Sequence, residues 1–241
     1  MKRKYYFLLL MPIIFGCNKP KAKNDTPAAK IDSVIITTDT LSNKVITDYT
    51  LIRIDSIVAV RNNITQEIDT LLINENDSGV DSTVEAGSLS SEYFFNTRHD
   101  VIYLIGPYLS YEYSYNGSGG AHPIYGSYYR TLYIPTKKEV SLDSLFEPDV
   151  IFRTLLKDSL IIRSMANKNP EDLYELISSL EGGCEISYSD LLISFAIKSV
   201  DSKKAEVEFG LTHGCEAMRG NFTTITINLP VSSVLHQYCK Y

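Results

Sequence analysis

The stretch SYEYSYNGSGGAHPIYGSYYRTLYI, residues 110–134, decides the fold. From Leu109 to Tyr115, large apolar or aromatic residues alternate with serine or glutamate, which is the two-residue period of a half-buried strand. A glycine-rich segment, residues 116–126, interrupts this pattern, and residues 127–134 are again rich in strand-forming side chains. The stretch therefore predicts two strands joined by an irregular glycine-rich loop.

The C-terminal part of the chain predicts three more strands. In the first two, alternate apolar residues share one face: Leu191, Ile193, Phe195 and Ile197, then Ala205, Val207, Phe209 and Leu211. Residues 201–204 (DSKK) form the hairpin loop between them, and Glu206 and Glu208 are expected on the outer face. Residues 223–229 form the third strand, which a short helix around Val234 follows.

Residues 148–181 predict the helices. Pro148 suits the first position of a helix, and an apolar stripe then continues to Met165 through Ile151, Leu155, Leu156, Ser159 and Ile162. A second helix starts at residues 169–171, turns Leu173, Leu176, Ile177 and Leu180 inward, and ends at Gly182-Gly183. Strands, then helices, then strands predict an α+β fold, with a mostly antiparallel sheet and two or three helices packed on one side.

The N-terminal end has the features of an exported lipoprotein. Lys2 to Lys4 are basic, and Tyr5 to Phe15 form an apolar run that is shorter than the roughly 20 residues of a bilayer-spanning helix. The run ends at Ile14-Phe15-Gly16-Cys17, which resembles the bacterial lipobox. We expect residues 1–16 to be a signal peptide and Cys17 to carry diacylglycerol and palmitate; a plain secretory signal with an incidental cysteine is the alternative.

The predicted lipid places the protein in a bacterial cell envelope, periplasmic or on the cell surface, with the membrane as one partner. Residues 17–30 (CNKPKAKNDTPAAK) have no apolar period and predict a flexible tether. Residues 31–241 then form the α+β domain. Its first region, residues 31–73, is rich in Ile, Val and Thr at 34–37 and 45–60, which predicts strands, and residues 74–91 predict a polar loop.

The charge of the chain excludes one class of partner. The formal net charge is −6, and removing residues 1–16 takes away three basic side chains and no acidic one, which gives −9. Nucleic-acid binders carry basic patches, so no nucleic-acid partner is expected. A negative surface suits a basic protein partner, and the alternative is that the charge only keeps the protein soluble.

Three sequence segments together resemble a known family: Ser110-Tyr111-Glu112-Tyr113, then Gly119-Gly120-Ala121-His122-Pro123, then Leu142-Asp143-Ser144-Leu145-Phe146. The region that carries this signature, residues 90–241, looks like a domain of lysozyme-sensing anti-sigma factors and of the N-terminal part of certain peptidoglycan deacetylases. The resemblance implies an extracellular α+β domain that binds lysozyme or another envelope ligand. Neither the transmembrane helix and sigma-binding segment nor the catalytic deacetylase domain of those proteins is recognisable here.

Five residues are candidates for ligand contact: His122, Tyr111, Tyr113, Tyr128 and Arg219. Tyrosines stack on sugars or partner proteins, but at strand spacing they also form core and cross-strand pairs. His122, in the glycine-rich loop, either meets a ligand or hydrogen-bonds the loop backbone. Arg219 either meets an anion or belongs to a disulfide-stapled turn, and His213 is expected to end the inward face of its strand.

An oxidising compartment predicts one disulfide among Cys184, Cys215 and Cys239. We expect Cys184 to pair with Cys215. The hairpin brings Cys215 opposite residues 189–190, and the chain before them can bend back to place Cys184 within reach. Cys239 is expected to stay free near the end of the chain. The rival pairing ties Cys239 to one of the other two.

The residues specify no reaction. There is no Gly-x-Ser-x-Gly elbow, and no cysteine–histidine spacing of a zinc site, so no cofactor or metal is expected. Glu185 and Glu216 would come together if Cys184 and Cys215 pair, but nothing places a substrate between them. A non-catalytic binding domain is the first hypothesis. The alternatives are a cell-wall hydrolase or deacetylase-associated enzyme, and a structural subunit of an envelope assembly.

Overall fold

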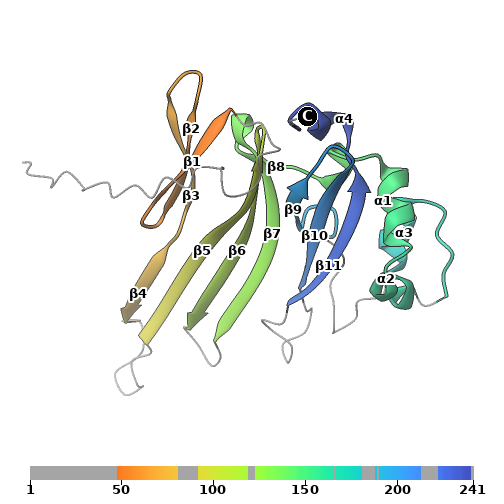
Figure 1. Cartoon of the computed structure of the whole chain (residues 1–241). Helices are drawn as coiled ribbons and strands as arrows, with labels where there is room; N and C mark the ends of the chain where they lie inside the picture. Colours follow the sequence, from red (N-terminus) through yellow and green to blue (C-terminus); the bar gives the residue numbers. More distant parts are fainter. Residues whose placement is uncertain are drawn as a thin grey trace, which may run out of the picture. The chain divides into compact units, whose positions relative to one another are not determined.

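A computed structural model represents the whole chain (Figure 1). It describes residues 48–80, 92–118, 123–165, 167–180, 188, 190–212 and 222–239. The chain divides into two compact units, residues 1–31 and 32–241, and every described residue belongs to the second.

The largest sheet has five antiparallel strands in the order β4-β5-β6-β7-β8. They are β4 (Asn76–Val80), β5 (Glu92–Ile105), β6 (Tyr108–Ser118), β7 (Ile124–Tyr133) and β8 (Lys138–Glu139), with β5, β6 and β7 as three long neighbours in Figure 1. The two strands predicted from residues 110–134 are therefore confirmed as β6 and β7. The loop predicted over residues 74–91 is wrong at its start, because β4 pairs through its backbone with β5 although its side chains are polar.

A second sheet has three strands in the order β1-β2-β3: β1 (Tyr49–Ile54), β2 (Ile57–Asn62) and β3 (Ile68–Ile73). A turn at Asp55, whose φ is 46°, splits the strand-like stretch 45–60 into β1 and β2. This sheet covers one face of the five-stranded sheet. The shared core consists of Leu51, Val58, Val60 and Leu72, packed on Leu104, Leu109, Tyr111, Leu132 and Ile134.

The third sheet has the order β11-β10-β9: β9 (Phe195–Val200), β10 (Lys204–Thr212) and β11 (Phe222–Pro230). The predicted inward face of β10 is confirmed, since Ala205, Val207, Phe209 and Leu211 are buried. The hairpin is confirmed too, because the Asp201 carboxylate accepts hydrogen bonds from the N–H groups of Lys203 and Lys204 at 2.7 and 2.9 Å.

The sequence prediction placed the start of the first C-terminal strand too early in the chain. Residues 191–193 form turns, with the N–H of Ile193 bonded to the carbonyl of Asp190 at 3.0 Å, and β9 begins only at Phe195. Ile193 is consequently exposed, although Leu191 is buried as predicted.

The described helices are short: α1 (Pro148–Leu155), α2 (Ser159–Ser164), α3 (Leu173–Ser179) and α4 (Ser233–His236), with 3₁₀ turns η2 (Ile134–Thr136) and η3 (Leu142–Ser144). The single helix predicted from Pro148 to Met165 is divided between α1 and α2. Asp158 is extended and caps α2 by accepting the N–H groups of Leu160 and Ile161 at 2.8 and 3.1 Å. The break changes the phase of the stripe, so that Ile161 is buried and Ile162 is exposed.

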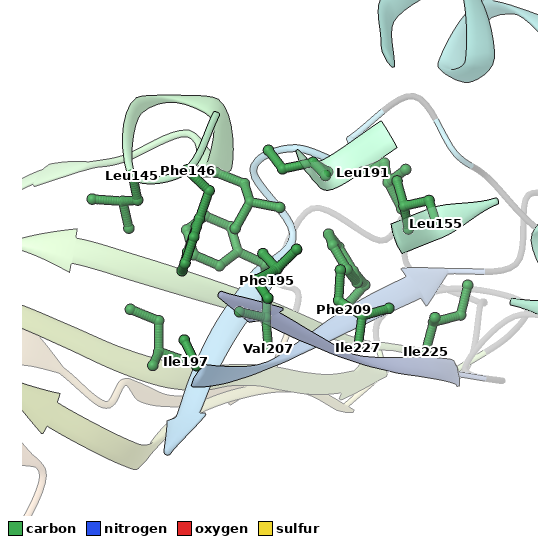
Figure 2. Packing of buried hydrophobic residues seen from close by; sticks show 14 of the residues in the cluster. Leu145, Phe146, Leu155, Leu191, Phe195, Ile197, Val207, Phe209, Ile225 and Ile227 are labelled. Atoms are coloured by element: carbon green, nitrogen blue, oxygen red, sulfur yellow. The ribbon is translucent and has the colours of Figure 1, made fainter. Parts of the chain in front are cut away.

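The main core lies between β9–β11, the helices and η3 (Figure 2). Figure 2 labels the residues that meet there: Leu145, Phe146, Leu155, Leu191, Phe195, Ile197, Val207, Phe209, Ile225 and Ile227. Leu142, Leu145 and Phe146 are all buried, so this part of the family-like signature has a structural role. Antiparallel sheets with a few short helices confirm the α+β class.

The outer edge of β9 lies against the second face of the five-stranded sheet. The Ile197 N–H donates to Ser110 Oγ at 2.9 Å, and Thr131 Oγ1 donates to the Phe195 carbonyl at 3.2 Å. These two hydroxyls therefore satisfy backbone groups that β10 cannot reach. The two smaller sheets cover opposite faces of the same half of the large sheet, near the β5–β6 turn, and the other half is more exposed.

Candidate functional site

Two of the predicted tyrosines, Tyr113 and Tyr128, lie together on one face of the exposed half. Tyr113 faces Tyr128 across β6 and β7, with ring centroids 6.5 Å apart and planes 19° from parallel, and Tyr115 lies 6.1 Å from Tyr128. Arg130 lies over the Tyr128 ring at 5.2 Å. Tyr111 is buried in the core shared with β1–β3, and this burial raises its pKa to about 12. The stripe thus passes from core to surface along β6.

Tyr113, Tyr115 and Tyr128 form a tyrosine cluster, and the ring of Tyr115 closely approaches the backbone at Gly126. A Cβ atom there would lie 2.6 Å from the ring of Tyr115, which faces Gly126 across the strands. The missing side chain lets the ring lie against the backbone of β7. This glycine is therefore a packing requirement of the tyrosine cluster.

His99 on β5 belongs to the same cluster, and the sequence reasoning missed it. Its ring lies 5.0 Å from Tyr113 and 5.6 Å from Tyr111, and its backbone N–H and its Nδ1 both contact Asn74 Oδ1, at 2.8 and 2.9 Å. Burial lowers the pKa of His99, so the imidazole is neutral at pH 7. The register between β5 and β6 places His99 directly opposite Tyr113, and no local sequence pattern contains this register.

A hollow of about 900 Å³ lies on the exposed half of the large sheet. We call it the amide-lined hollow. Its lining residues are Asp55, Ser56, Asn74, Asn76, Asn96, Thr97, Arg98, Ser114, Tyr115, Asn116, Tyr125, Gly126 and Ser127. Six of these residues form two cross-strand rows on one face of β5, β6 and β7: Asn96, Asn116 and Tyr125, then Arg98, Ser114 and Ser127. By strand alternation this face is opposite to the tyrosine cluster. Thr97, Tyr115 and Gly126 form the row between these two and belong to the tyrosine face, so the hollow is lined by residues from both faces.

Hydrogen bonds hold several of these side chains in place. Asn96 Nδ2 donates to Asn116 Oδ1 at 3.1 Å, and Ser127 donates to the Glu112 carboxylate. Arg98 forms an ion pair with Asp100 at 2.7 Å, and its side chain is largely exposed. The wall therefore presents amides and hydroxyls, and the charge of Arg98 is balanced by that of Asp100.

A charged contact joins this face to the third sheet beyond the hollow. Lys198 pairs with Glu208 at 2.8 Å, and Glu208 hydrogen-bonds Tyr129 of β7. Burial, together with Glu208 and Glu112, raises the pKa of Tyr129 to about 12, so that its hydroxyl stays protonated and donates to the carboxylate. Glu208 was predicted to face solvent. It is instead buried, because its face of β10 packs against β7.

The other predicted site residues, Cys17, His122, Cys184, Cys215 and Arg219, lie outside the described residues, as do His213, Glu185 and Glu216. Cys239 is a buried thiol whose Sγ donates to the Asp201 carbonyl at 3.4 Å, and burial raises its pKa. The pairing of Cys184 with Cys215 stays a prediction.

Two searches of the described residues gave negative results. No group of three or more His, Cys, Asp or Glu side chains there could hold a metal ion. No helix in the same part of the chain is long and apolar enough to cross a bilayer.

Comparison with known proteins found no match, neither a protein-family model nor a curated protein nor a solved structure.

Proposed function

We propose that this chain is a lipid-anchored cell-envelope protein whose α+β domain is a non-catalytic binding module. The observation that carries this proposal is the amide-lined hollow, a concavity of about 900 Å³ on the exposed half of a sheet whose other half is covered on both faces. Ligand sites are concave and contain a few placed polar groups, and their volumes are roughly 300–1,000 Å³.

The fixed hydrogen-bonding groups favour binding over catalysis. Asn96 and Asn116 hold each other, and Arg98 is already paired with Asp100, so the wall offers neutral donors and acceptors. In this proposal α1, α2 and α3 form a supporting layer on one side of β9–β11, because their buried residues share its core. The lipid on Cys17 and the tether 17–30 would hold the hollow near the membrane.

Co-purification from an envelope extract tests the proposal. The full-length chain, tagged and extracted in a mild detergent, is compared with the Asn96→Ala/Asn116→Ala variant. Changing both residues avoids leaving one amide without its partner. The matched control is Thr224→Ala/Thr226→Ala, two exposed polar residues of β11. Wild type and control should enrich the same species, and the hollow variant should lose it. Equal enrichment by all three would refute a ligand site in the hollow.

A basic, lysozyme-like protein is a second candidate partner. It is supported by the charge of −9 that remains without residues 1–16 and by the resemblance of residues 90–241 to lysozyme-sensing domains. Attraction between exposed charges is screened within about 8 Å at physiological ionic strength. Binding to a basic lysozyme should therefore weaken as salt rises, and lysine-acetylated lysozyme should bind less. Calorimetry that shows no heat with several lysozymes at low salt would remove this partner.

A further inference from the structure

The two rows of the amide-lined hollow give the first clue to its ligand. Neighbouring strands lie about 4.8 Å apart, and alternate residues on one strand about 6.7 Å apart. The six side chains of the two rows thus form a grid in which a flat polar ligand meets several groups at once. Asp55 and Ser56 of the β1–β2 turn also line the hollow, as do Asn74 and Asn76.

The amides provide the hydrogen-bonding chemistry. Each asparagine side chain has two N–H donors and one carbonyl acceptor. The bond between Asn96 Nδ2 and Asn116 Oδ1 orients both groups, and it engages neither the Asn96 side-chain carbonyl nor the Asn116 N–H donors. Ser114 lies in the adjacent row. Hydroxyl and acetamido groups match this set of donors and acceptors.

Tyr125 provides a stacking surface beside the amides. It faces Asn116 across β6 and β7 and lines the hollow, and 47% of its surface is exposed. An aromatic ring with one polar tip suits a ligand that has an apolar face and polar edges. A pyranose ring has this character, because its axial C–H groups form a face and its hydroxyls form the edge.

The charges in the hollow oppose an anionic ligand. Asp55 and Arg98 have opposite signs, and Arg98 already pairs with Asp100 at 2.7 Å. A phosphate site requires cationic groups or backbone N–H groups aimed at the anion, and the guanidinium here is engaged by a carboxylate. An uncharged ligand is therefore favoured over an anionic one.

We infer that the amide-lined hollow binds an uncharged oligosaccharide, with Tyr125 against the apolar face of one sugar and the amides on its hydroxyl or acetamido groups. This inference rests on the proposed function and names its ligand class.

Titration of the full-length chain in a sugar-free detergent with tetra-N-acetylchitotetraose tests it by calorimetry. Tyr125→Ala and Asn96→Ala/Asn116→Ala should each weaken binding by about tenfold or more. The matched control is Tyr174→Ala, which removes a tyrosine of α3 that is 54% exposed and should leave binding unchanged. Tyr125→Phe, which keeps the ring, should retain most of the affinity, and circular dichroism verifies the fold of each variant.

The inference would be overturned if wild type did not bind at about 10 mM sugar, a concentration far above tight or moderate dissociation constants. It would also be overturned if Tyr174→Ala weakened binding as much as Tyr125→Ala does. Binding of inorganic polyphosphate in place of the sugar would overturn it as well. The co-purification experiment separates the two proposals. If the wild type binds no sugar but co-purifies with a partner that the Asn96→Ala/Asn116→Ala variant loses, the inference fails and the proposed function stands. If that variant loses no partner either, both fail.

Discussion

His99 shows how one side chain joins the tyrosine cluster to Asn74, which lies between β3 and β4. Its ring packs on Tyr111 and Tyr113, and the Asn74 carbonyl holds its Nδ1 and its backbone N–H. Burial outweighs the carboxylates of Glu75 and Asp100, so the pKa of the histidine is lowered on folding. The folded state therefore favours the neutral imidazole.

This lowered pKa predicts a pH dependence of stability. The unfolded chain binds a proton near pH 6.5, and the folded chain binds it only at lower pH, so the free energy of unfolding rises with pH in this window. The contribution of His99 to the free energy of unfolding is complete above its pKa in the unfolded chain. It is lost as the pH falls through its lower pKa in the folded chain. Urea melts at about pH 7.5 and 5.5, on either side of the unperturbed value, should show a smaller loss for His99→Gln than for wild type. An equal loss in the two proteins would contradict this.

At the residue scale the sequence predicted the aromatic face better than the hollow. Tyr113 was recognisable because Tyr111, Tyr113 and Tyr115 alternate with glutamate and serine, and Tyr128 because the next strand-forming stretch is rich in tyrosine. The lining residues Asn96, Ser114 and Ser127 fall on the polar positions of three different strands, and such positions normally face solvent. Only the register between β5, β6 and β7, which no local pattern contains, brings them together.

At the scale of elements, the contact between β9 and the large sheet determines which half is covered. Ser110 Oγ accepts the Ile197 N–H at 2.9 Å and shares a 2.9 Å hydrogen bond with Thr131, whose hydroxyl donates to the Phe195 carbonyl. Ser110 must donate to Thr131 for this chain of bonds to be complete. Both hydroxyls are buried, so neither partner has water as a substitute.

Removing the Ser110 hydroxyl should therefore be costly. Ser110→Ala leaves the buried Ile197 N–H without an acceptor, which should lower the free energy of unfolding by about 1–3 kcal/mol. The matched control is Ser114→Ala, on the same strand and face but in the exposed half, which should change stability by about 0.5 kcal/mol or less. Denaturant melts measure both, and similar losses in the two variants would disprove the edge contact.

Elements with a clear local period were predictable. β10 alternates over eight residues from Ala205 to Thr212, and its buried face was identified correctly. The helix predicted from Pro148 was not, because the Asp158 cap stops and restarts it with a different phase. β4 was missed because backbone hydrogen bonds pair it with β5, and this pairing leaves no pattern in its side chains.

At the scale of the whole molecule, the proposed function requires an N-terminal lipid joined by the tether to a domain with a ligand site. Cys17→Ala should abolish lipid attachment and move the protein from the membrane fraction to the soluble fraction. The reason is that the acyl chains on Cys17 are the proposed stable anchor of the protein in the membrane. Mass spectrometry of the mature N-terminus tests this directly. An unmodified Cys17 in the wild type would refute the anchor, while the binding proposal would remain.

The central claim is that the exposed half of the five-stranded sheet holds the ligand. Its most direct test is photocrosslinking in intact cells, with a photoreactive phenylalanine analogue replacing Ser114 in the hollow or Thr226 on the exposed side of β11. The account predicts an ultraviolet-dependent adduct at position 114 and none at position 226. An adduct at position 226 with none at position 114 would contradict it.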